Sequence, residues 1–311
     1  MLLFWAGMQI RALWSTAVLL LAALPASAQQ PGIDWREVAL TCDRDALDPD
    51  SYELTTTAQA INLLEPRYGF WDRFIINEHV RTLRDLNLDA HALAERARER
   101  DPRNLMAHSI LGRQYLTLGW QRAARDAWRS VLGSGGAVVF TATLYDVDAK
   151  SYFLVAFDRD AMRIYRAGQF TGTVERHLGM AEFPEPDATA FYAAWAGCPD
   201  PAVAPSATIP WSQVREIRSG NWVLWFKLTD KVTIVSDRNK QKSLEEIKVN
   251  LHGQTGHTEL YVSPDFDGDL NVRGVGLGPY DYQRSLRDII SEFVDPGRRI
   301  KLSSSSRGAG W

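Results

Sequence analysis

The sequence predicts an α+β protein, in which helical hairpins in the N-terminal half precede an antiparallel β-rich domain with a C-terminal helix.

 Two observations support this prediction. Between about 54 and 133, Ala, Leu and Arg are frequent, Pro and Gly are sparse, and apolar residues recur every three or four positions, as in amphipathic helices. From residue 137 onward, short apolar runs alternate with turns rich in Asp, Asn and Gly, as in a β-meander.

The first 28 residues are expected to direct export. Arg11 is the only charged residue among them, residues 12–24 are almost wholly apolar, and a small-residue pattern ends at Ala28. This combination is typical of a signal peptide that is cleaved after Ala28. A membrane anchor is the alternative reading, but the apolar run is shorter than the roughly 20 residues that a membrane span needs. Translation from Met8 instead of Met1 gives a tidier signal, so Met8 is an alternative start.

Composition and charge narrow the class of protein. Hydrophobic residues make up 45% of the 311 residues and charged residues 23%, which excludes global disorder, collagen and a coiled-coil rod. The formal net charge of −3 argues against a nucleic-acid binder, which normally carries a strongly basic domain. No second apolar stretch has the length of a membrane span. We therefore expect a soluble, exported protein, either periplasmic or secreted.

The chain contains two cysteines, Cys42 and Cys198. An even number of cysteines in an exported protein predicts a disulfide, and two unrelated thiols remain the alternative. The pair would join an N-terminal arm, residues 29–53, to a segment far along the chain.

The period of the apolar pattern changes at residues 133–136, which read Gly-Ser-Gly-Gly. We place a helical domain over 54–133 and a β-rich domain over 137–301, with a Pro-rich insertion at 168–208 that contains one short helix over 188–196. Strands are expected over 137–145, 151–157, 162–167, 221–228, 232–236, 245–251, 259–263 and 270–276. A helix is expected over 282–294, and the Ser-rich tail 302–311 is expected to be mobile.

One helical hairpin carries a repeat signature. It reads His108-x-x-Leu111-Gly112-x-x-Tyr115, then a turn at Gly119, then Ala124-x-x-x-Trp128. Gly112 allows two helices to approach closely, Tyr115 and Trp128 fill the space between them, and Ala124 is small where they cross. One period earlier, small residues stand at the positions of a second helix that ends before Pro102: Ala90, Ala94 and Ala97.

Residues 71–133 therefore resemble the tetratricopeptide repeat (TPR) family. The resemblance implies helical hairpins that bind a protein or peptide and have no chemistry of their own. An ordinary helical hairpin, whose Ala and aromatic spacing reflects core packing alone, is the alternative.

The candidate partner-binding residues are His108, Arg125 and Arg129. Arginines gather on this segment and would hold an acidic peptide or a carboxylate through bidentate bonds. The competing interpretation is a solvated helix face with local ion pairs.

A second candidate site is an acidic turn formed by Asp265, Asp267 and Asp269. Alternating oxygen side chains on a Gly-containing turn are suited to Ca²⁺. The positions that an EF-hand requires for Gly and Glu hold Leu270 and Gly276 instead, so a looser Ca²⁺ loop and a plain hairpin turn both remain open.

Residues 209–294 begin with Ile209-Pro210-Trp211 and are similar to bacterial pleckstrin-homology-like domains, which implies a bent antiparallel barrel with a C-terminal helix. A generic sheet packed by one helix is the alternative. The sequence contains no H-E-x-x-H motif and no nucleophile elbow. The leading hypothesis is an exported, non-enzymatic binding or scaffolding protein. A cell-envelope hydrolase with its site in the β-rich domain and a Ca²⁺-stabilised structural module are the rivals.

Overall fold

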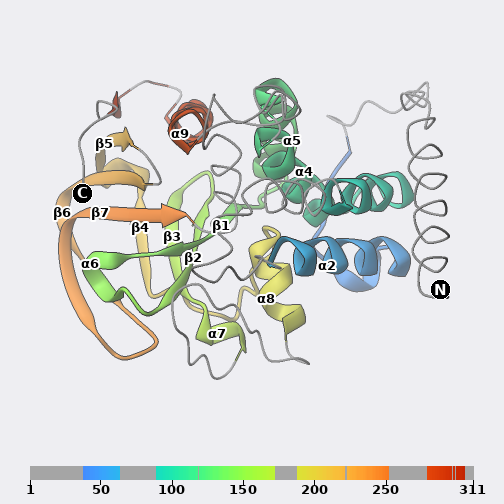
Figure 1. Ribbon diagram of the computed structural model, residues 1–311, viewed down its shortest axis with the longest axis horizontal. Coiled ribbons are helices and arrows are strands. Elements are labelled where there is room, and N and C mark those ends of the chain that lie inside the picture. Colours follow the sequence, from blue (N-terminus) through green and yellow to red (C-terminus); the bar gives the residue numbers. More distant parts are fainter. Residues whose placement is uncertain are drawn as a thin grey trace, which may run out of the picture. The chain divides into compact units, whose positions relative to one another are not determined.

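The computed structural model describes eight parts of the chain, which are residues 38–63, 89–117, 119–171, 188–220, 223–251, 279–295, 297 and 299–304. Within these parts, helices precede an eight-stranded, mostly antiparallel sheet, and a further helix follows (Figure 1). The α+β prediction is confirmed. The predicted signal peptide over 1–28 and the predicted strands over 259–263 and 270–276 lie outside the described residues.

The helical half contains α2 (Pro49–Leu63), a helical stretch over 89–100, α4 (Leu105–Thr117) and α5 (Gln121–Gly133), with a short 3-10 helix η1 (Arg44–Ala46) before them. The residues predicted to be small at helix crossings are fully buried: Ala90, Ala94, Ala97 and Ala124. Among the helices described, none is both long enough and apolar enough to cross a membrane.

The close approach of α4 and α5 depends on Gly112. A β-carbon added at Gly112 would lie 2.2 Å from Nε1 of Trp128, so any larger residue would displace the indole ring. The Trp128 ring also meets the Phe140 ring edge to face, with 6.1 Å between the centroids. Trp128 therefore packs against both the neighbouring helix and the first strand of the sheet.

The sheet has the strand order β4-β3-β2-β1-β7-β6-β5-β8. Its strands are β1 (Val138–Thr143), β2 (Tyr152–Phe157), β3 (Ala161–Arg166), β4 (Ala207–Pro210), β5 (Val214–Ser219), β6 (Val223–Val235), β7 (Gln241–Leu251) and β8 (Lys301–Ser304). The shorter helices are α6 (Tyr145–Asp148), α7 (Gly168–Thr171), α8 (Ala188–Trp195) and the 3-10 helix η3 (Trp211–Gln213), and the C-terminal helix is α9 (Pro279–Val294).

Strand β1 is buried on both faces. Side chains alternate across a strand, and Phe140 packs into the main core with the helices, whereas Val139 packs into a second cluster with Phe191 and Trp195 of α8. The described part of the predicted insertion over 168–208 thus supplies α7 and α8, which cover the second face of the sheet.

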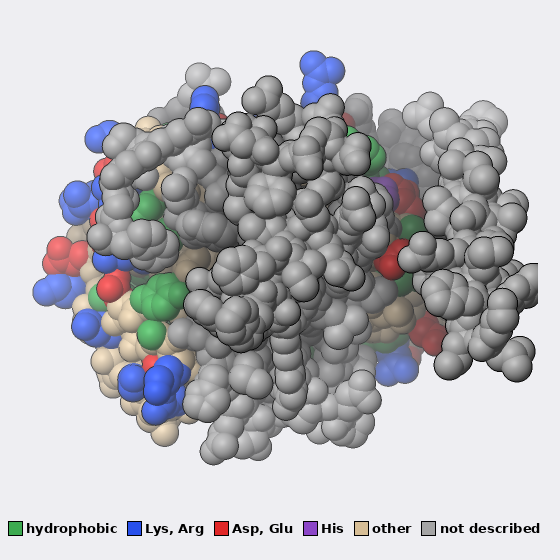
Figure 2. Space-filling view, viewed as in Figure 1, with side chains coloured by type: hydrophobic (Ala, Val, Ile, Leu, Met, Phe, Trp, Pro, Cys, Tyr) green, Lys and Arg blue, Asp and Glu red, His purple; other side chains and the backbone are tan. Residues whose placement is uncertain are grey.

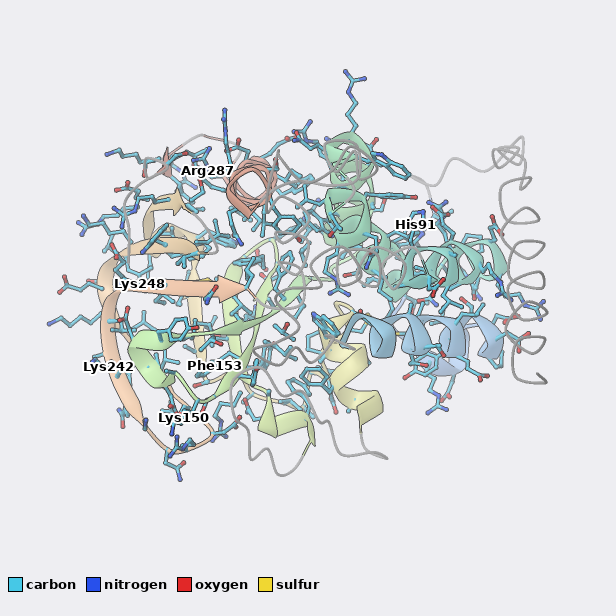
Figure 3. All side chains as sticks on the ribbon, viewed as in Figure 1. His91, Lys150, Phe153, Lys242, Lys248 and Arg287 are labelled. Carbon is cyan, nitrogen blue, oxygen red and sulfur yellow. A yellow bond between two sulfur atoms is a disulfide. The ribbon has the colours of Figure 1, made fainter. Side chains whose placement is uncertain are left out.

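One end of the sheet, at β8, differs from the sequence prediction. Strand β8 pairs in parallel with β5, and Ser304 lies opposite Ser219. Nη1 of Arg287, labelled in Figure 3, donates to Ser304 Oγ at 2.7 Å and to Ser219 Oγ at 3.2 Å. The prediction of a mobile tail over 302–311 is therefore wrong for 302–304, because a neighbouring strand and a buried guanidinium hold these residues. Residues after Ser304 lie outside the described part.

At the other end, Ser206 links the segment before β4 to β6. Its hydroxyl donates to the Val235 carbonyl at 2.8 Å and accepts from the Val235 N–H at 3.0 Å. The two strands predicted over 221–228 and 232–236 form one strand, β6, with an irregularity in register between Lys227 and Val232.

The helices and the sheet share one hydrophobic core. A single cluster of buried residues includes Ile110 of α4, Trp128 of α5, Phe153 of β2, Phe226 of β6 and Leu286 of α9. The chain from Val38 onward forms one compact unit by its internal contacts. The change from helix to strand near 133–137 is therefore a change of secondary structure within a continuous core.

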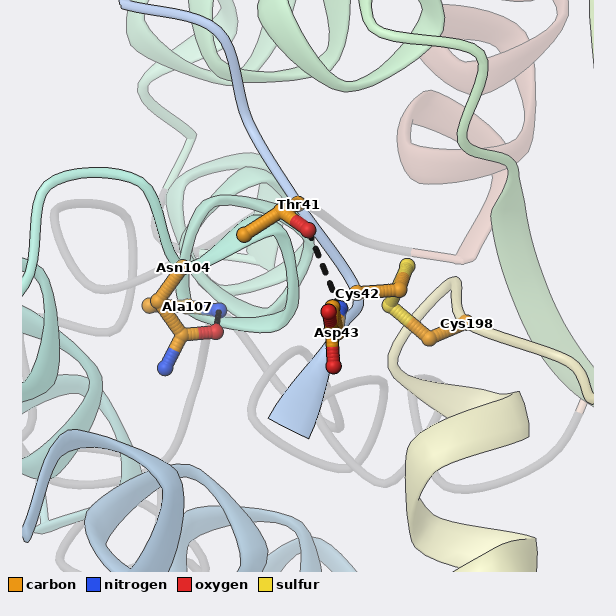
Figure 4. Close-up of a disulfide and its surroundings, with 6 residues drawn as sticks. All are labelled: Thr41, Cys42, Asp43, Asn104, Ala107 and Cys198. Carbon is orange, nitrogen blue, oxygen red and sulfur yellow. Dashed lines mark hydrogen bonds between the residues drawn. A yellow bond between two sulfur atoms is a disulfide. The ribbon is translucent and has the colours of Figure 1, made fainter. Parts of the chain in front are cut away.

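The disulfide joins Cys42 in the N-terminal arm to Cys198, which lies just after α8. The sulfur atoms of Cys42 and Cys198 are 2.06 Å apart, across 156 positions of sequence, and Figure 4 shows the pair beside Thr41. Backbone bonds continue the attachment, because Thr41 N–H donates to Arg103 O at 2.8 Å and Leu105 N–H donates to Thr41 O at 3.2 Å. The predicted cysteine pairing is present in the structure.

A buried carboxylate holds the tip of the β6–β7 hairpin. Asp148 accepts hydrogen bonds from Ser151 Oγ at 2.8 Å, Ser236 Oγ at 3.1 Å and Lys240 Nζ at 3.1 Å. Burial alone would raise the pKa of Asp148, but these bonds and one from the Lys150 backbone N–H outweigh it and lower the pKa to about 2. Asp148 therefore links α6 to the hairpin through a charged group.

Replacing both cysteines, as Cys42→Ser with Cys198→Ser, should lower the free energy of unfolding. The chain-entropy model gives a loss of about 5 kcal/mol for a loop of this size. Denaturant unfolding under oxidising conditions measures the loss. Reductant should move the wild type to the midpoint of the double variant and leave that variant unchanged. Equal midpoints for oxidised wild type and double variant would contradict the prediction.

Asp148→Asn should lower the free energy of unfolding by about 1–3 kcal/mol at neutral pH, because the buried hydrogen-bond network loses its negative charge and one of its two acceptor oxygens. The pKa of Asp148 is depressed from 3.8 to about 2 in the folded protein, so its contribution is complete above pH 4 and disappears as the pH falls toward 2. Unfolding curves across this pH range test the prediction. Asp146→Asn, at a partly exposed carboxylate paired with Lys248, is the control. A difference between wild type and Asp148→Asn that stays constant with pH would refute it.

Candidate functional site

The main group of polar and aromatic side chains on the helical half consists of His91, Glu95, Arg98, Tyr115 and Trp120, which we call the Trp120 cluster. His91, Glu95 and Arg98 lie on the helical stretch over 89–100, Tyr115 lies near the end of α4, and Trp120 directly precedes α5. Three consecutive segments therefore contribute to one place on the surface.

The chain turns sharply between α4 and α5, and this turn positions Trp120. Gly119 adopts a φ of 83°, a conformation that favours glycine. The Trp120 N–H donates to Tyr115 O at 2.7 Å, and Trp120 O accepts from the Ala124 N–H at 3.0 Å. The backbone of Trp120 is thus fixed by the end of one helix and the start of the next, while its side chain is 53% exposed.

Three rings meet in the cluster. The centroids of His91 and Tyr115 are 5.4 Å apart, and the Trp120 ring lies 5.9 Å from each of them. Figure 3 labels His91 on the helical side of the molecule, and in Figure 2 histidine surface appears there between acidic and basic side chains. The exposed indole therefore rests on the buried Tyr115 ring and the partly buried His91 ring.

Glu95 organises the polar part of the cluster. Its carboxylate accepts hydrogen bonds from the Tyr115 hydroxyl and from Nη2 of Arg98, and His91 Nε2 lies 3.9 Å from Glu95 Oε1. Nη1 of Arg98 is in addition 3.5 Å from the Tyr115 hydroxyl. The carboxylate thus fixes the phenol and the guanidinium against each other.

The protonation states in the cluster follow from burial. Burial raises the pKa of Tyr115 well above its ordinary value, and nearby Glu95 adds to the effect while Arg98 opposes it. Burial lowers the pKa of His91, although Glu95 acts in the opposite direction. At neutral pH the cluster therefore contains a protonated phenol, an uncharged imidazole and an indole.

His108, a predicted partner-binding residue, is only 3% exposed. Its Nε2 lies 3.0 Å from Pro102 O, and burial lowers its pKa to about 4 despite that hydrogen bond. The ring is therefore uncharged at neutral pH and packs at the junction between the helical stretch over 89–100 and α4. This placement puts His108 in the interior of the protein and not on its surface.

Arg125 and Arg129, the other predicted partner-binding residues, both pair with Glu292 of α9. Nε of Arg125 is 2.9 Å from Glu292 Oε2, and Nη2 of Arg129 is 3.3 Å from Glu292 Oε1. Arg129 also lies 3.5 Å from Asp126. Both arginines thus link α5 to the C-terminal helix, across a long stretch of sequence that the sequence analysis did not connect. Of these contacts, the one between Arg129 and Asp126 is the local ion pairing of the competing interpretation.

The predicted Ca²⁺ ligands Asp265, Asp267 and Asp269 lie outside the described residues. In the part of the chain that the structure describes, no group of three or more His, Cys, Asp or Glu side chains is placed to hold a metal ion.

Sequence reasoning did not select Trp120, His91 or Glu95 as site residues. Trp120 directly follows the turn glycine of the repeat signature, where a large apolar side chain has no core to enter. His91, Glu95 and Arg98 are spaced by four and three positions, which places them on one face of a helix. These two signals together would have indicated the cluster.

Comparison with known proteins adds no relative. No protein-family model matches the chain, no curated protein matches it, and no solved structure matches it. The contacts of the described residues are therefore the basis for a functional proposal.

Proposed function

We propose that this chain is an exported, non-enzymatic protein that binds a protein or peptide partner through the Trp120 cluster. The observation that carries the proposal is the position of Trp120. Its ring is the most exposed of the large hydrophobic side chains in the described residues, at 53%, and it is nevertheless held by two neighbouring rings.

A fixed, exposed indole is suited to anchoring a partner. Trp, Tyr and Arg are the residues that most often dominate the energy of protein interfaces, and the Trp120 cluster contains one of each. Binding loses less free energy to the ordering of side chains when those side chains are already fixed. The bonds from Tyr115 and Arg98 to Glu95 supply this order before a partner arrives.

The packing of the helices supports the same role. The resemblance to tetratricopeptide repeats implies binding of a protein or peptide, and it predicts that Gly112, Ala124 and Trp128 meet where two helices cross. The close approach of Trp128 to Gly112 and the burial of Ala124 agree with that expectation. The membership of the family itself stays a prediction.

Export is supported by the cysteine pair. Disulfides persist in oxidising compartments such as the bacterial periplasm and the extracellular space, and Cys42 and Cys198 are at bonding distance. The signal peptide predicted over 1–28 agrees with this location.

Trp120→Ala should weaken binding of the partner by about 30-fold, which corresponds to about 2 kcal/mol for the loss of an interface anchor. The immobilised full chain is used to isolate a saturable partner from an envelope fraction, and the dissociation constant is then measured for wild type and variant. The substitution removes an exposed ring, so the melting temperature should change little.

Tyr145→Ala is the matched control. Tyr145 is also a large exposed ring, at 45%, but it lies on α6 beside the sheet. The proposal requires that Tyr145→Ala binds like the wild type. Equal binding by wild type and Trp120→Ala, or the absence of any saturable partner, would contradict it.

A further inference from the structure

Arg113 lies in the centre of α4 and is completely buried, with an exposed fraction of 0%. Its Nη1 donates to Val139 O of β1 at 2.8 Å and to Trp195 O at the end of α8 at 2.5 Å. One end of the guanidinium therefore joins a helix, a strand and a second helix.

The other end of the guanidinium is unused. Within the described structure, Nε and Nη2 of Arg113 have no hydrogen-bond partner. We call these two N–H groups the Arg113 fork. Adjacent N–H groups of this kind match the two oxygen atoms of a carboxylate or similar oxyanion.

The charge of Arg113 is also uncompensated by the residues described. Burial lowers its pKa to about 9, so the group stays charged at neutral pH. The titratable neighbour that acts on it is Tyr282, and burial raises the pKa of Tyr282 far above its ordinary value, so the phenol stays neutral. A buried cation without a counter-charge is strongly destabilising.

Further buried polar groups lie on the same face of α4 as Arg113 and on the neighbouring Trp195. Ser109 and Thr117 stand four positions before and after Arg113 and so share its face of α4. Their hydroxyls, and Nε1 of Trp195, are buried and have no hydrogen-bond partner in the described part of the chain. The guanidinium carbon of Arg113 lies 5.0 Å from the Trp195 ring centroid. These groups can donate several hydrogen bonds, and an anion can accept them.

We propose that the Arg113 fork binds one small carboxylate-like anion inside the protein, at the edge of the guanidinium that does not bond to Val139 O and Trp195 O. The anion supplies the missing negative charge and accepts hydrogen bonds from the fork, with Ser109 and Trp195 as further donors. The full burial of Arg113 and its neighbours limits the guest to a few atoms. This site is separate from the Trp120 cluster and does not depend on the proposed partner.

Thermal unfolding of the full chain in formate tests the proposal. Formate replaces gluconate at constant ionic strength, so that a small carboxylate is compared with one too large for the interior. The melting temperature should rise saturably, by about 3–5 °C when formate is about tenfold above its dissociation constant.

Two Arg-to-Lys variants test whether the effect of formate on the melting temperature depends on the Arg113 fork or on any buried arginine. Arg113→Lys keeps the charge but removes the planar pair of donors, so the rise in formate should disappear. Arg287→Lys changes another buried arginine, whose guanidinium is bonded to Asp288, Ser219, Ser303 and Ser304, and the rise should remain. An unchanged rise in Arg113→Lys, or no saturable rise in the wild type, would overturn the proposal.

A direct measurement keeps the test decisive if Arg113→Lys fails to fold. Carbon-13-labelled formate added to the wild type should give one bound NMR signal per chain, with a nuclear Overhauser contact to the Trp195 indole N–H. The absence of a bound signal, or a signal without that contact, would show that the fork holds no such anion.

Discussion

The contact of Trp128 with Gly112 and Phe140 is the interaction on which the rest of the structure depends. The indole lies against the Gly112 backbone, where no β-carbon fits, and its ring meets Phe140 of β1. Helix packing and sheet packing therefore use the same side chain. Arg113, the residue after Gly112, also connects α4 to β1 and α8, because it donates hydrogen bonds to the carbonyls of Val139 and Trp195.

The position of the Trp120 cluster depends on this packing of Trp128 against Gly112 and Phe140. Tyr115 lies less than one turn after Gly112 on α4, so the packing of α4 against α5 fixes where the phenol and its bond to Glu95 lie. The turn at Gly119 then places Trp120 over the phenol. The pairing of Arg125 with Glu292 of α9 fastens α5 to the C-terminal helix. An exposed ring on a short turn is thereby held by the core of the protein.

Much of the fold could be predicted because its signals are local. The spacing of Gly112 and Trp128 indicated a close helix crossing, and short apolar runs separated by turns indicated β1 to β3. Strand β8 was missed because it pairs with β5, about 85 positions earlier in the chain, and a run of serines carries no apolar pattern. The site was harder to predict. His108 was expected to bind a partner because it belongs to the repeat signature. Its ring is instead buried beside the Pro102 carbonyl, a contact that the repeat signature does not contain.

Native-state hydrogen exchange tests most directly whether the helices and the sheet form one unit. If the core is shared through Trp128, slowly exchanging amides in α4 and in β1 should open with the same free energy and respond equally to denaturant, because both are exposed by the same unfolding event. Opening of α4 and α5 at a distinctly lower free energy than β1 and β2 would contradict the account. It would show instead that the helical half unfolds as a separate domain.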